Sequence, residues 1–431
     1  MKQITEHIEG NNLLPNYQSA YRRFHGVETA MIKMYHDLLN SVDKSKVTLV
    51  VMIDLSAAFD TIDIQIALDI LQTDFGIQGT PLNWIKSYLS QRTMKVTIGS
   101  SSSDSIDLKY GVPQGSCAGP VIFTMYVAAL RKVVRQYPTD LYGYADDHKL
   151  AFRFQAGNLH EEAIVLQHLN ECLADIINWM TSFKLKMNNS KTEITSIVYG
   201  TKQQLAKVNL TSVDVGGCTV HCVNKVRDLG VLMNNALNFD RHIQKKCQIS
   251  HVQLRNLKDI RNNLSQKSIQ ILVHGLVHSH LDFCNALFAD LPAYQLDRLQ
   301  RVQNHAARVV MNATYEERSI DLLKALHWLP IRARIMFKIL VLVFRVHQGY
   351  APLYIQSLFK RNTKCYRLRS TSDIQFEIPK TRIKIADRSI AIVGPKWWNG
   401  LPLNLKTAKN ENVFRKNLKT YLFQRFFEHS N

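Results

Sequence analysis

The spacing of the apolar positions changes along the chain. Residues 47–53 form a continuous apolar run rich in β-branched side chains, which is typical of a buried central strand. From there to about residue 235, short strand-like runs alternate with helical patterns. From about residue 239 to 348 the apolar positions recur with helical spacing. The pattern predicts an α+β region followed by a helical one, with a boundary near residues 235–240.

The same patterns predict the individual elements. Residues 1–46 are polar and mainly helical, with a break at the Leu-Pro-Asn of residues 14–16. Further helices are expected at about 63–74, 81–91, 119–136, 159–182, 239–262, 266–288, 292–312, 330–348 and 410–428. Strands are expected in hairpins at about 94–110 and 141–152, and at roughly 193–199, 212–223 and 229–233. Between residue 350 and the last helix, the chain is predicted to be basic, irregular and turn-rich.

Acidic side chains stand at the ends of two predicted strands. Asp54 follows the run at 47–53, and Asp146 and Asp147 belong to a Tyr-Ala-Asp-Asp sequence at the turn of the 141–152 hairpin. Carboxylates grouped at one edge of a sheet suit a clamp for divalent metal ions, a recurrent device for nucleotidyl transfer. The alternative is that the adjacent pair only fills a turn, as aspartates often do.

Charge adds a candidate partner. The chain of 431 residues has a net charge of +19, and this charge is unevenly distributed. Residues 1–240 hold 22 Lys and Arg against 23 Asp and Glu, a balance of −1, whereas residues 241–431 hold 32 against 12, a balance of +20. Such a one-sided excess is typical of a protein that binds a polyanion, and we expect nucleic acid rather than a membrane surface.

The cysteines and the N-terminus indicate an intracellular protein. Seven scattered cysteines, an odd number, favour free thiols in a reducing compartment. A zinc site formed by Cys218, His221 and Cys222, with His242 and Cys247 downstream, is not favoured, because the spacing matches no common zinc module. The sequence opens on no secretory signal and contains no apolar run of membrane-spanning length. The expected location is the nucleus, the cytoplasm or both, without secretion or membrane association.

Three segments occur in a fixed order: Asp-Leu-Ser-Ala-Ala-Phe-Asp at 54–60, Gly-Val-Pro-Gln-Gly-Ser at 111–116 and Tyr-Ala-Asp-Asp at 144–147. In this order they resemble motifs A, B and C of a reverse transcriptase palm. Flanking segments at 18–22, 188–193 and 226–231 are similar to those of the non-LTR (LINE-type) retrotransposon polymerases. Segments at 281–286, 327–330 and 394–399 resemble the region after the polymerase in the Jockey-like and chicken-repeat-like branch.

The resemblance covers nearly the whole chain and implies its organisation. It implies an α+β right-hand polymerase with partial fingers at 1–46, a palm with the remaining fingers elements at 47–235, a helical thumb at 236–350 and a basic region at 351–431. It also implies RNA-directed DNA synthesis in target-primed reverse transcription, with an RNA template, a DNA primer or target, dNTPs and two Mg²⁺ ions, for which Mn²⁺ could substitute.

Site residues follow from the same resemblance. The expected metal ligands are Asp54, Asp146, Asp147 and the backbone carbonyl of Leu55, and Lys191 is expected to protonate the departing pyrophosphate. The expected dNTP-binding residues are Arg22, Phe59, Gln114 and Gly115, with Phe59 as the steric gate against a ribose 2′-hydroxyl. Leu229 and Gly230 resemble the primer-grip turn, and the expected nucleic-acid contacts on the following helix are Lys245, Lys246, Arg255 and Lys258.

Some of these positions have simpler interpretations. Phe59 could be an ordinary core aromatic, and the glycines around Gln114 could merely form a helix-entry loop. Arg23 could take the role of Arg22, and each basic residue after 240 could be a solvated surface charge. Asp60 is expected to cap the helix that starts near residue 62, rather than to bind metal. Trp328, Trp397 and Trp398 are expected to pack in the core rather than to stack on bases.

Compared with full-length relatives, the chain has no endonuclease domain and lacks the early fingers strands before residue 18. We therefore expect an N-terminally truncated polymerase whose strand nicking is supplied elsewhere. An alternative is a catalytically inactive relic that retains nucleic-acid binding. A third possibility, an RNA-synthesising polymerase, is disfavoured by the bulky side chain of Phe59.

Overall fold

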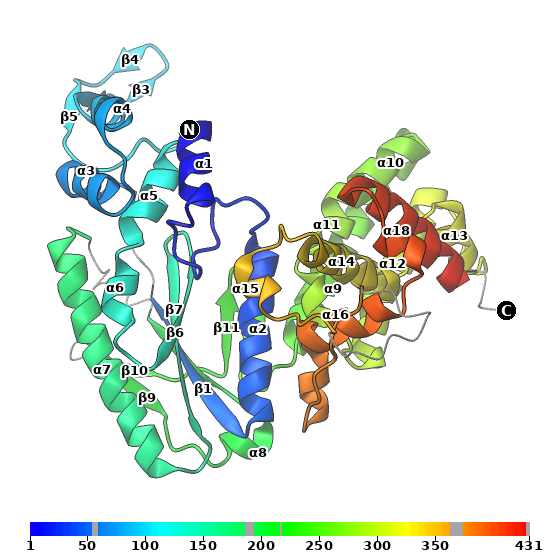
Figure 1. The fold of residues 1–431 in the computed structure, drawn as a ribbon. Helices are drawn as coiled ribbons and strands as arrows, with labels where there is room; N and C mark the ends of the chain where they lie inside the picture. Colours follow the sequence, from blue (N-terminus) through cyan, green and yellow to red (C-terminus); the bar gives the residue numbers. More distant parts are fainter. Residues whose placement is uncertain (54–58, 186–193, 216–217, 363–373, 428–431) are drawn as a thin grey trace. The chain divides into compact units, whose positions relative to one another are not determined.

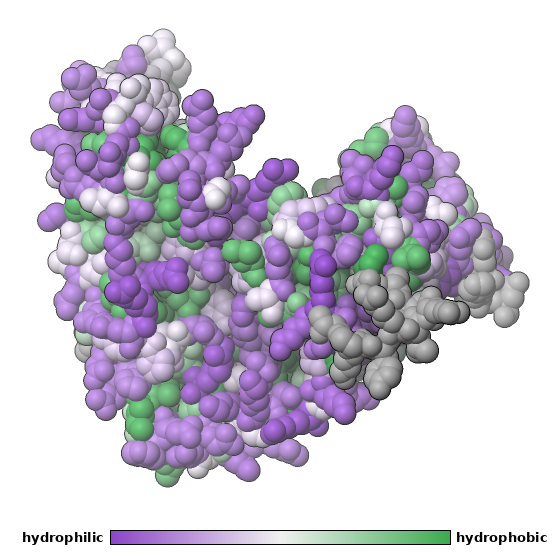
Figure 2. Space-filling model, viewed as in Figure 1, coloured by the Kyte–Doolittle hydropathy of each residue, from purple (hydrophilic) through white to green (hydrophobic). Residues whose placement is uncertain are grey.

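The computed structural model describes residues 1–53, 59–185, 194–215, 218–362 and 374–427. Its contacts divide the chain into two compact units (Figure 1). The N-terminal unit consists of Met1–Ala30 and Ser45–Asn224, and the C-terminal unit of Met31–Lys44 and Lys225–Asn431. On the face drawn in Figure 2, hydrophilic side chains cover most of each unit and hydrophobic ones appear only in small patches, because most apolar side chains lie inside.

A four-stranded antiparallel sheet forms the centre of the N-terminal unit. Its strands follow the order β6 (Thr139–Tyr144), β7 (Asp147–Gln155), β1 (Lys46–Ile53) and β8 (Thr195–Tyr199). Strand β1 lies between two neighbours, and all of its residues except Lys46 and Met52 are buried. The prediction of a buried central strand at 47–53 is therefore confirmed.

Helices cover this sheet and extend beyond it (Figure 1). They are α1 (Lys2–Gly10), α3 (Ile64–Thr73), α4 (Gly79–Leu89), α5 (Gly119–Val127), α6 (Leu130–Val134), α7 (Leu159–Ser182) and α8 (Lys202–Leu205). Short ribbons pair β2 (Arg92–Met94) with β5 (Ile106–Leu108), β3 (Thr97–Ile98) with β4 (Ser101–Ser102), and β9 (Ser212–Val215) with β10 (Cys218–His221). Alternate β1 residues, from Val47 to Ile53, share one apolar core with α5 and α7, as the period of a strand requires.

The C-terminal unit is mainly helical. It begins with most of α2 (Val27–Asp43) and the two-stranded ribbon β11 (Lys225–Asp228) and β12 (Val231–Asn234). Its longer helices are α9 (Asp240–Asp259), α10 (Gln266–Val273), α12 (Ala293–Met311), α13 (Ser319–Ala325), α14 (Ile331–His347), α16 (Ile390–Asn399) and α18 (Glu411–Phe427). Short pieces complete it: η1 (Arg261–Asn263), η2 (His274–His278), α11 (Ser279–Asp282), η3 (Asn285–Phe288), α15 (Leu353–Gln356), η4 (Lys384–Arg388) and α17 (Leu403–Lys406).

Helix α14 lies at the centre of this second core. Ile339, Leu340 and Phe344 on α14 are fully buried, and the Phe344 ring stacks on Phe414 of α18 at a centroid distance of 4.3 Å. Trp398 is completely buried beside them, and Trp328 is 3% exposed. The expectation that these two tryptophans pack rather than stack on bases is confirmed.

The helical period predicted after residue 239 is also confirmed, but several boundaries were wrong. The expected helix at 266–288 is interrupted by the π-helical turn η2 and ends at Asp282, because Cys284 adopts a left-handed φ of 53°. The expected helix at 119–136 is divided into α5 and α6. The region after 350 was predicted to be irregular, yet it contains the largely buried helix α16. The Gly-Pro sequence inside this helix is typical of turns, so the sequence did not indicate a helix there.

The predicted α+β class is confirmed, whereas the assignment of residue ranges to fingers, palm, thumb and basic region remains a prediction. The contacts place the division between the two units at Asn224 and Lys225. None of the described helices is both long and apolar enough to cross a lipid bilayer.

Candidate active site

The acidic pair lies at the turn between β6 and β7. Tyr144 pairs with Asp147 across this hairpin, which leaves Ala145 and Asp146 as the two turn residues. Ala145 is buried and has a φ of 57°, a left-handed conformation that costs a non-glycine residue about 1 kcal/mol. The turn therefore needs support from outside the hairpin.

Gln18 supplies that support. Its side chain is 1% exposed; its Nε2 donates to the Ala145 carbonyl (3.3 Å), and its Oε1 accepts from the Ala145 N–H (3.0 Å). The backbone on either side is joined as well, because Ser19 N–H donates to the Gly143 carbonyl (3.0 Å) and Gly143 N–H donates to the Tyr17 carbonyl (3.1 Å). The segment before α2 thus fixes the turn that carries Asp146.

Both acidic residues of the turn are at least partly exposed, while hydrogen bonds hold the turn's backbone. Asp147 is exposed and Asp146 is half-buried. Nδ1 of His148 lies 2.9 Å from the Asp146 carbonyl, which can only accept, so this nitrogen carries the proton. Burial lowers the pKa of His148 to about 4, so the imidazole stays neutral near pH 7. The Asp146 carboxylate is left available to a ligand.

The end of β1 lies beside this turn. Ile53, the last described residue of β1, pairs with His148 across the antiparallel ladder. The expected ligands Asp54 and Leu55 follow Ile53 in sequence and, like Lys191, lie outside the described residues. Among the described residues, which do not include Asp54, no three His, Cys, Asp or Glu side chains are grouped to hold a metal ion.

Two further expected residues meet where the segment at 59–60 crosses the loop at 111–114. Val112 N–H donates to the Phe59 carbonyl (2.8 Å), and Gln114 Nε2 donates to both carboxylate oxygens of Asp60 (2.8 and 3.0 Å). The Phe59 ring is half-buried and stacks on Phe123 of α5, with 4.5 Å between centroids. The structure therefore brings Phe59 and Gln114 together through Asp60.

This crossing corrects the role expected for Asp60. Helix α3 begins at Ile64, and its cap is Asp63, whose side chain accepts from Gln65 and Ile66 N–H. Asp60 instead orients Gln114. Gly111 is required at the crossing, because it has a φ of 80° and a Cβ there would lie 2.8 Å from the Asp60 Cα.

The partly buried guanidinium of Arg22 makes hydrogen bonds within the loop that precedes α2. Its Nη1 donates to the carbonyls of Pro15 and Gln18, at 3.1 Å each. Arg23 lies beside the ring of Phe24, with its guanidinium carbon 4.7 Å from the centroid. A role for Arg22 in binding dNTPs stays a prediction.

The expected primer-grip turn connects β11 and β12 in the C-terminal unit. Leu229 and Gly230 have φ values of 43° and 85°, as in the two-residue turns that match the twist of a hairpin. The turn is therefore present, and its role stays a prediction.

The expected nucleic-acid contacts on α9 differ in environment. Lys245, Arg255 and Lys258 are exposed. Lys246 is half-buried, with its Nζ 4.7 Å from the Phe283 ring centroid, and burial lowers its pKa. Three of the four cations are therefore open to a polyanion, whereas Lys246 also packs against an aromatic ring.

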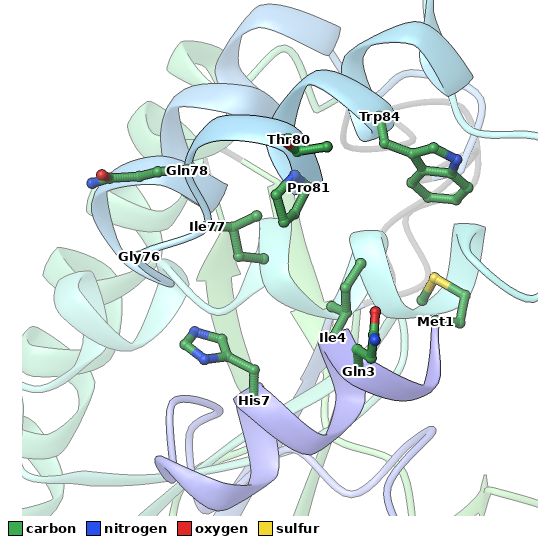
Figure 3. A pocket seen from close by; sticks show the side chains of 10 residues that line it. All are labelled: Met1, Gln3, Ile4, His7, Gly76, Ile77, Gln78, Thr80, Pro81 and Trp84. Carbon is green, nitrogen blue, oxygen red and sulfur yellow. The ribbon is translucent and has the colours of Figure 1, made fainter.

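A cavity of about 600 Å³ lies between α1 and the start of α4 (Figure 3). Trp84 borders it and stacks on Tyr88, with the two rings 5.5 Å apart and nearly parallel. None of the described residues that line it is Asp or Glu; they are Met1, Gln3, Ile4, His7, Gly76, Ile77, Gln78, Thr80, Pro81 and Trp84.

Gln18 and His148 are the site residues that sequence reasoning missed. Gln18 belongs to the segment at 18–22, but that motif does not indicate its role. Its hydrogen bonds to Ala145, 127 residues along the chain, leave no periodic pattern in the sequence. His148 follows the acidic pair directly, and its neutral state depends on burial that the sequence does not reveal.

Comparison with known proteins gives this site its context. A family model described as reverse transcriptase (RNA-dependent DNA polymerase) matches residues 1–272. The chain is 24% identical over 319 residues to a probable RNA-directed DNA polymerase from transposon BS of Drosophila melanogaster, covering 72% of this chain and 34% of that protein. It is 21% identical over 330 residues to the RNA-directed DNA polymerase from mobile element jockey of Drosophila funebris, covering 75% and 35%. The chain spans about a third of the length of these relatives.

Among solved structures, apo telomerase from Candida tropicalis aligns with a TM-score of 0.41 and 12% identity, covering 78% of this chain and 54% of that chain. The family match covers more than half of the chain and agrees with the motifs at 54–60, 111–116 and 144–147. The chain therefore belongs to the reverse transcriptase family, and the relatives that it resembles come from Drosophila transposons and mobile elements.

Proposed function

We propose that this chain copies an RNA template into DNA by transferring dNTPs to a primer 3′-hydroxyl. The observation that carries the proposal is the supported turn that presents Asp146 and Asp147 beside the end of β1. The relatives that share this segment are named RNA-directed DNA polymerases, and this chain spans about a third of their length.

The residues at this turn fit a divalent metal ion. Members of the family generally use such ions, and carboxylate and carbonyl oxygens are the ligands that Mg²⁺ prefers. Asp146 and Asp147 would hold the metals together with Asp54 and the Leu55 carbonyl. Two bound Mg²⁺ ions would supply charge stabilisation for the attacking and leaving oxygens. The neutral His148 fixes the Asp146 carbonyl and adds no positive charge beside the ligands.

The residues around the 59–60 crossing would position the incoming nucleotide. Phe123 braces the Phe59 ring, and Asp60 orients the Gln114 amide, so both side chains are held before a substrate arrives. Gly115 has a φ of 75° and open space above its Cα, which allows close approach of a sugar or phosphate. In this proposal Arg22 contacts the triphosphate and Lys191 protonates the pyrophosphate.

The remaining partners belong to the same proposal. The RNA template and DNA primer would contact Leu229, Gly230 and the exposed cations of α9 in a target-primed reaction. The nick that provides the primer would be made by an endonuclease outside this segment.

A primer-extension assay tests the proposed function. The purified chain is incubated with a homopolymer RNA template, a DNA primer, the matching dNTP and Mg²⁺, with Mn²⁺ in a parallel reaction. We expect a DNA product that disappears with a metal chelator and returns when Mg²⁺ is added in excess. Tight binding of the primer–template without any metal-dependent product would refute the proposal and favour an inactive nucleic-acid-binding chain.

Phe59→Val is expected to relax sugar selectivity. Removing the ring opens space for a 2′-hydroxyl, so the ratio of kcat/KM for dNTP to kcat/KM for rNTP should fall at least about tenfold, equivalent to roughly 1.4 kcal/mol. The ratio of the two kcat/KM values is measured because losing the stacking on Phe123 lowers the stability of the protein, which lowers both values equally and leaves their ratio unchanged. An unchanged ratio would show that Phe59 is only a core aromatic.

Gln18→Ala is expected to weaken metal-dependent synthesis. The change removes both hydrogen bonds that fix Ala145, and loss of such supporting contacts typically costs about 10- to 100-fold in metal affinity or activity. The Mg²⁺ concentration for half-maximal synthesis should rise together with the loss in kcat. The matched control is Gln203→Ala on the exposed face of α8, which should leave both values unchanged.

A further inference from the structure

A small basic pocket lies in the C-terminal unit where the last turns of α9 and α12 meet η1. We call it the α9–α12 pocket. Its volume is about 180 Å³, and its lining includes Lys258, Arg261, His305, Arg308 and Tyr315. The described residues that line it include no Asp or Glu, and three of them, Lys258, Arg261 and Arg308, carry a full positive charge.

The two arginines are fixed in place by backbone carbonyls. Arg261 donates from Nε to Val309 O (3.0 Å), from Nη2 to Val310 O (3.2 Å) and from Nη1 to Leu264 O (3.1 Å). The first two bonds satisfy carbonyls at the C-terminal end of α12, where the helix dipole would otherwise repel an anion. A guanidinium has five N–H donors, so two of those on Arg261 stay available to a ligand.

Arg308 is anchored in the same way. It donates from Nε to Thr314 O (3.2 Å) and from Nη2 to Glu317 O (3.3 Å), which again leaves N–H groups for an anion. The Glu317 carboxylate accepts from Thr314 N–H in the same loop, at 3.0 Å, and Glu317 is not among the described residues that line the pocket. The donors of the pocket are thus pre-oriented, as phosphate recognition by arginine requires.

The local potential is positive. Lys258 is exposed and forms no ion pair within the described residues. The pKa of His305 is lowered, first by burial and then by the charges of His251, Lys258 and Arg308. An anion in the pocket would relieve this repulsion.

Tyr315 adds an aromatic surface at the edge of the pocket. It lies in the loop after α12 and is 81% exposed, an unusual position for so large a ring. The guanidinium carbon of Arg308 lies 5.5 Å from its ring centroid, which links the aromatic surface to the anion donors. Only an unpaired base has a free face to stack on such a ring, because bases within a duplex are already stacked.

We propose that the α9–α12 pocket binds single-stranded nucleic acid, with a backbone phosphate against Lys258, Arg261 and Arg308 and a neighbouring unpaired base on Tyr315. The inference rests on the proposed function, since an enzyme that copies RNA must hold unpaired strand. It adds Arg308 and Tyr315, which no motif identified, and assigns Lys258 to a single strand rather than to a duplex.

The test measures binding by the full chain to a short labelled single-stranded RNA, to DNA of the same sequence and to the corresponding duplex. Lys258→Glu and Tyr315→Ala change the pocket without removing the arginine bonds that hold the fold. Matched controls make the same changes at exposed positions elsewhere in the unit, Lys324→Glu on α13 and Tyr294→Ala on α12.

Each pocket variant should weaken single-strand binding by about tenfold. Tyr315→Ala should leave duplex binding within about twofold, and Lys258→Glu should lower the salt slope of the affinity by about one. Tighter binding of RNA would assign the pocket to the template, and tighter binding of DNA would assign it to the primer or displaced strand. Either variant behaving like its control, or displacement of the RNA by polyglutamate at equal charge concentration, would overturn the proposal.

The same variants separate this inference from the proposed function. Asp146→Asn removes a proposed metal ligand in the N-terminal unit and should leave single-strand affinity unchanged. If the native chain made no DNA but Tyr315→Ala still weakened single-strand binding, the polymerase proposal would fail and the pocket would stand. If synthesis occurred and the pocket variants bound normally, the pocket alone would fail.

Discussion

Asp146→Asn is expected to reduce DNA synthesis by roughly a thousandfold, since metal-borne charge stabilisation is worth several kcal/mol. Asparagine keeps the size of the side chain and removes the negative charge. The turn should survive, because His148 and Gln18 bind backbone groups at residues 145 and 146 rather than the carboxylate. Primer extension at saturating dNTP and Mg²⁺ measures the loss.

Two controls distinguish the loss of a metal ligand from a general loss of activity or of nucleic-acid binding. Asp214→Asn makes the same change at an exposed position on β9 and should retain full synthesis. Affinity of Asp146→Asn for the primer–template should match that of the native chain, since the α9 cations are untouched. If the variant kept more than about a tenth of native synthesis, Asp146 would not be a metal ligand.

Gly111→Ala is the second large effect that we expect. At a φ of 80°, any side chain costs about 1–2 kcal/mol, and the new Cβ would lie 2.8 Å from the Cα and carbonyl oxygen of Asp60. Backbone cannot move aside as a flexible side chain does, so overpacking should add about 1–3 kcal/mol. Displacing the 59–60 segment also shifts Phe59 and Gln114, and synthesis should fall along with stability.

Gly99→Ala separates the two causes. Gly99 also has a positive φ, 61°, but an added Cβ would meet nothing within 4 Å. In this variant the free energy of unfolding should fall only by the cost of the left-handed backbone, and DNA synthesis should stay at the native level. Chemical denaturation of both variants measures the difference, and equal destabilisation would show that the crossing at Asp60 is not tight.

The parts of the site that the sequence predicts are those with local signals. The β-branched run at 47–53 identifies a central strand, and the short apolar segments at 141–143 and 150–152 place the acidic pair between them at a hairpin turn. The glycines at 111 and 115 mark positions with positive φ. Each of these features depends on neighbours within a few residues, which is the range over which propensity and periodicity act.

The parts that the sequence does not predict depend on distant contacts. Asp60 was expected to be the cap of α3, but Asp63 is the cap, and Asp60 binds Gln114, which lies 54 residues away in the sequence. The break after α11 depends on the left-handed backbone of Cys284, a residue with no preference for that conformation. Both outcomes are decided by tertiary packing, which overrides local propensity.

The bonds between Gln18 and Ala145 have a consequence for the inheritance of this sequence. Gln18 lies 127 residues before Ala145, the neighbour of the Asp-Asp pair, so mutation or loss of the glutamine or of the pair can occur without the other. A copy that begins after Gln18 would retain an unchanged Tyr-Ala-Asp-Asp while leaving the buried Ala145 amide without its partner, at a cost of about 1–3 kcal/mol. In this sequence, an intact turn is therefore better indicated by Gln18 and Asp146 together than by the acidic motif alone.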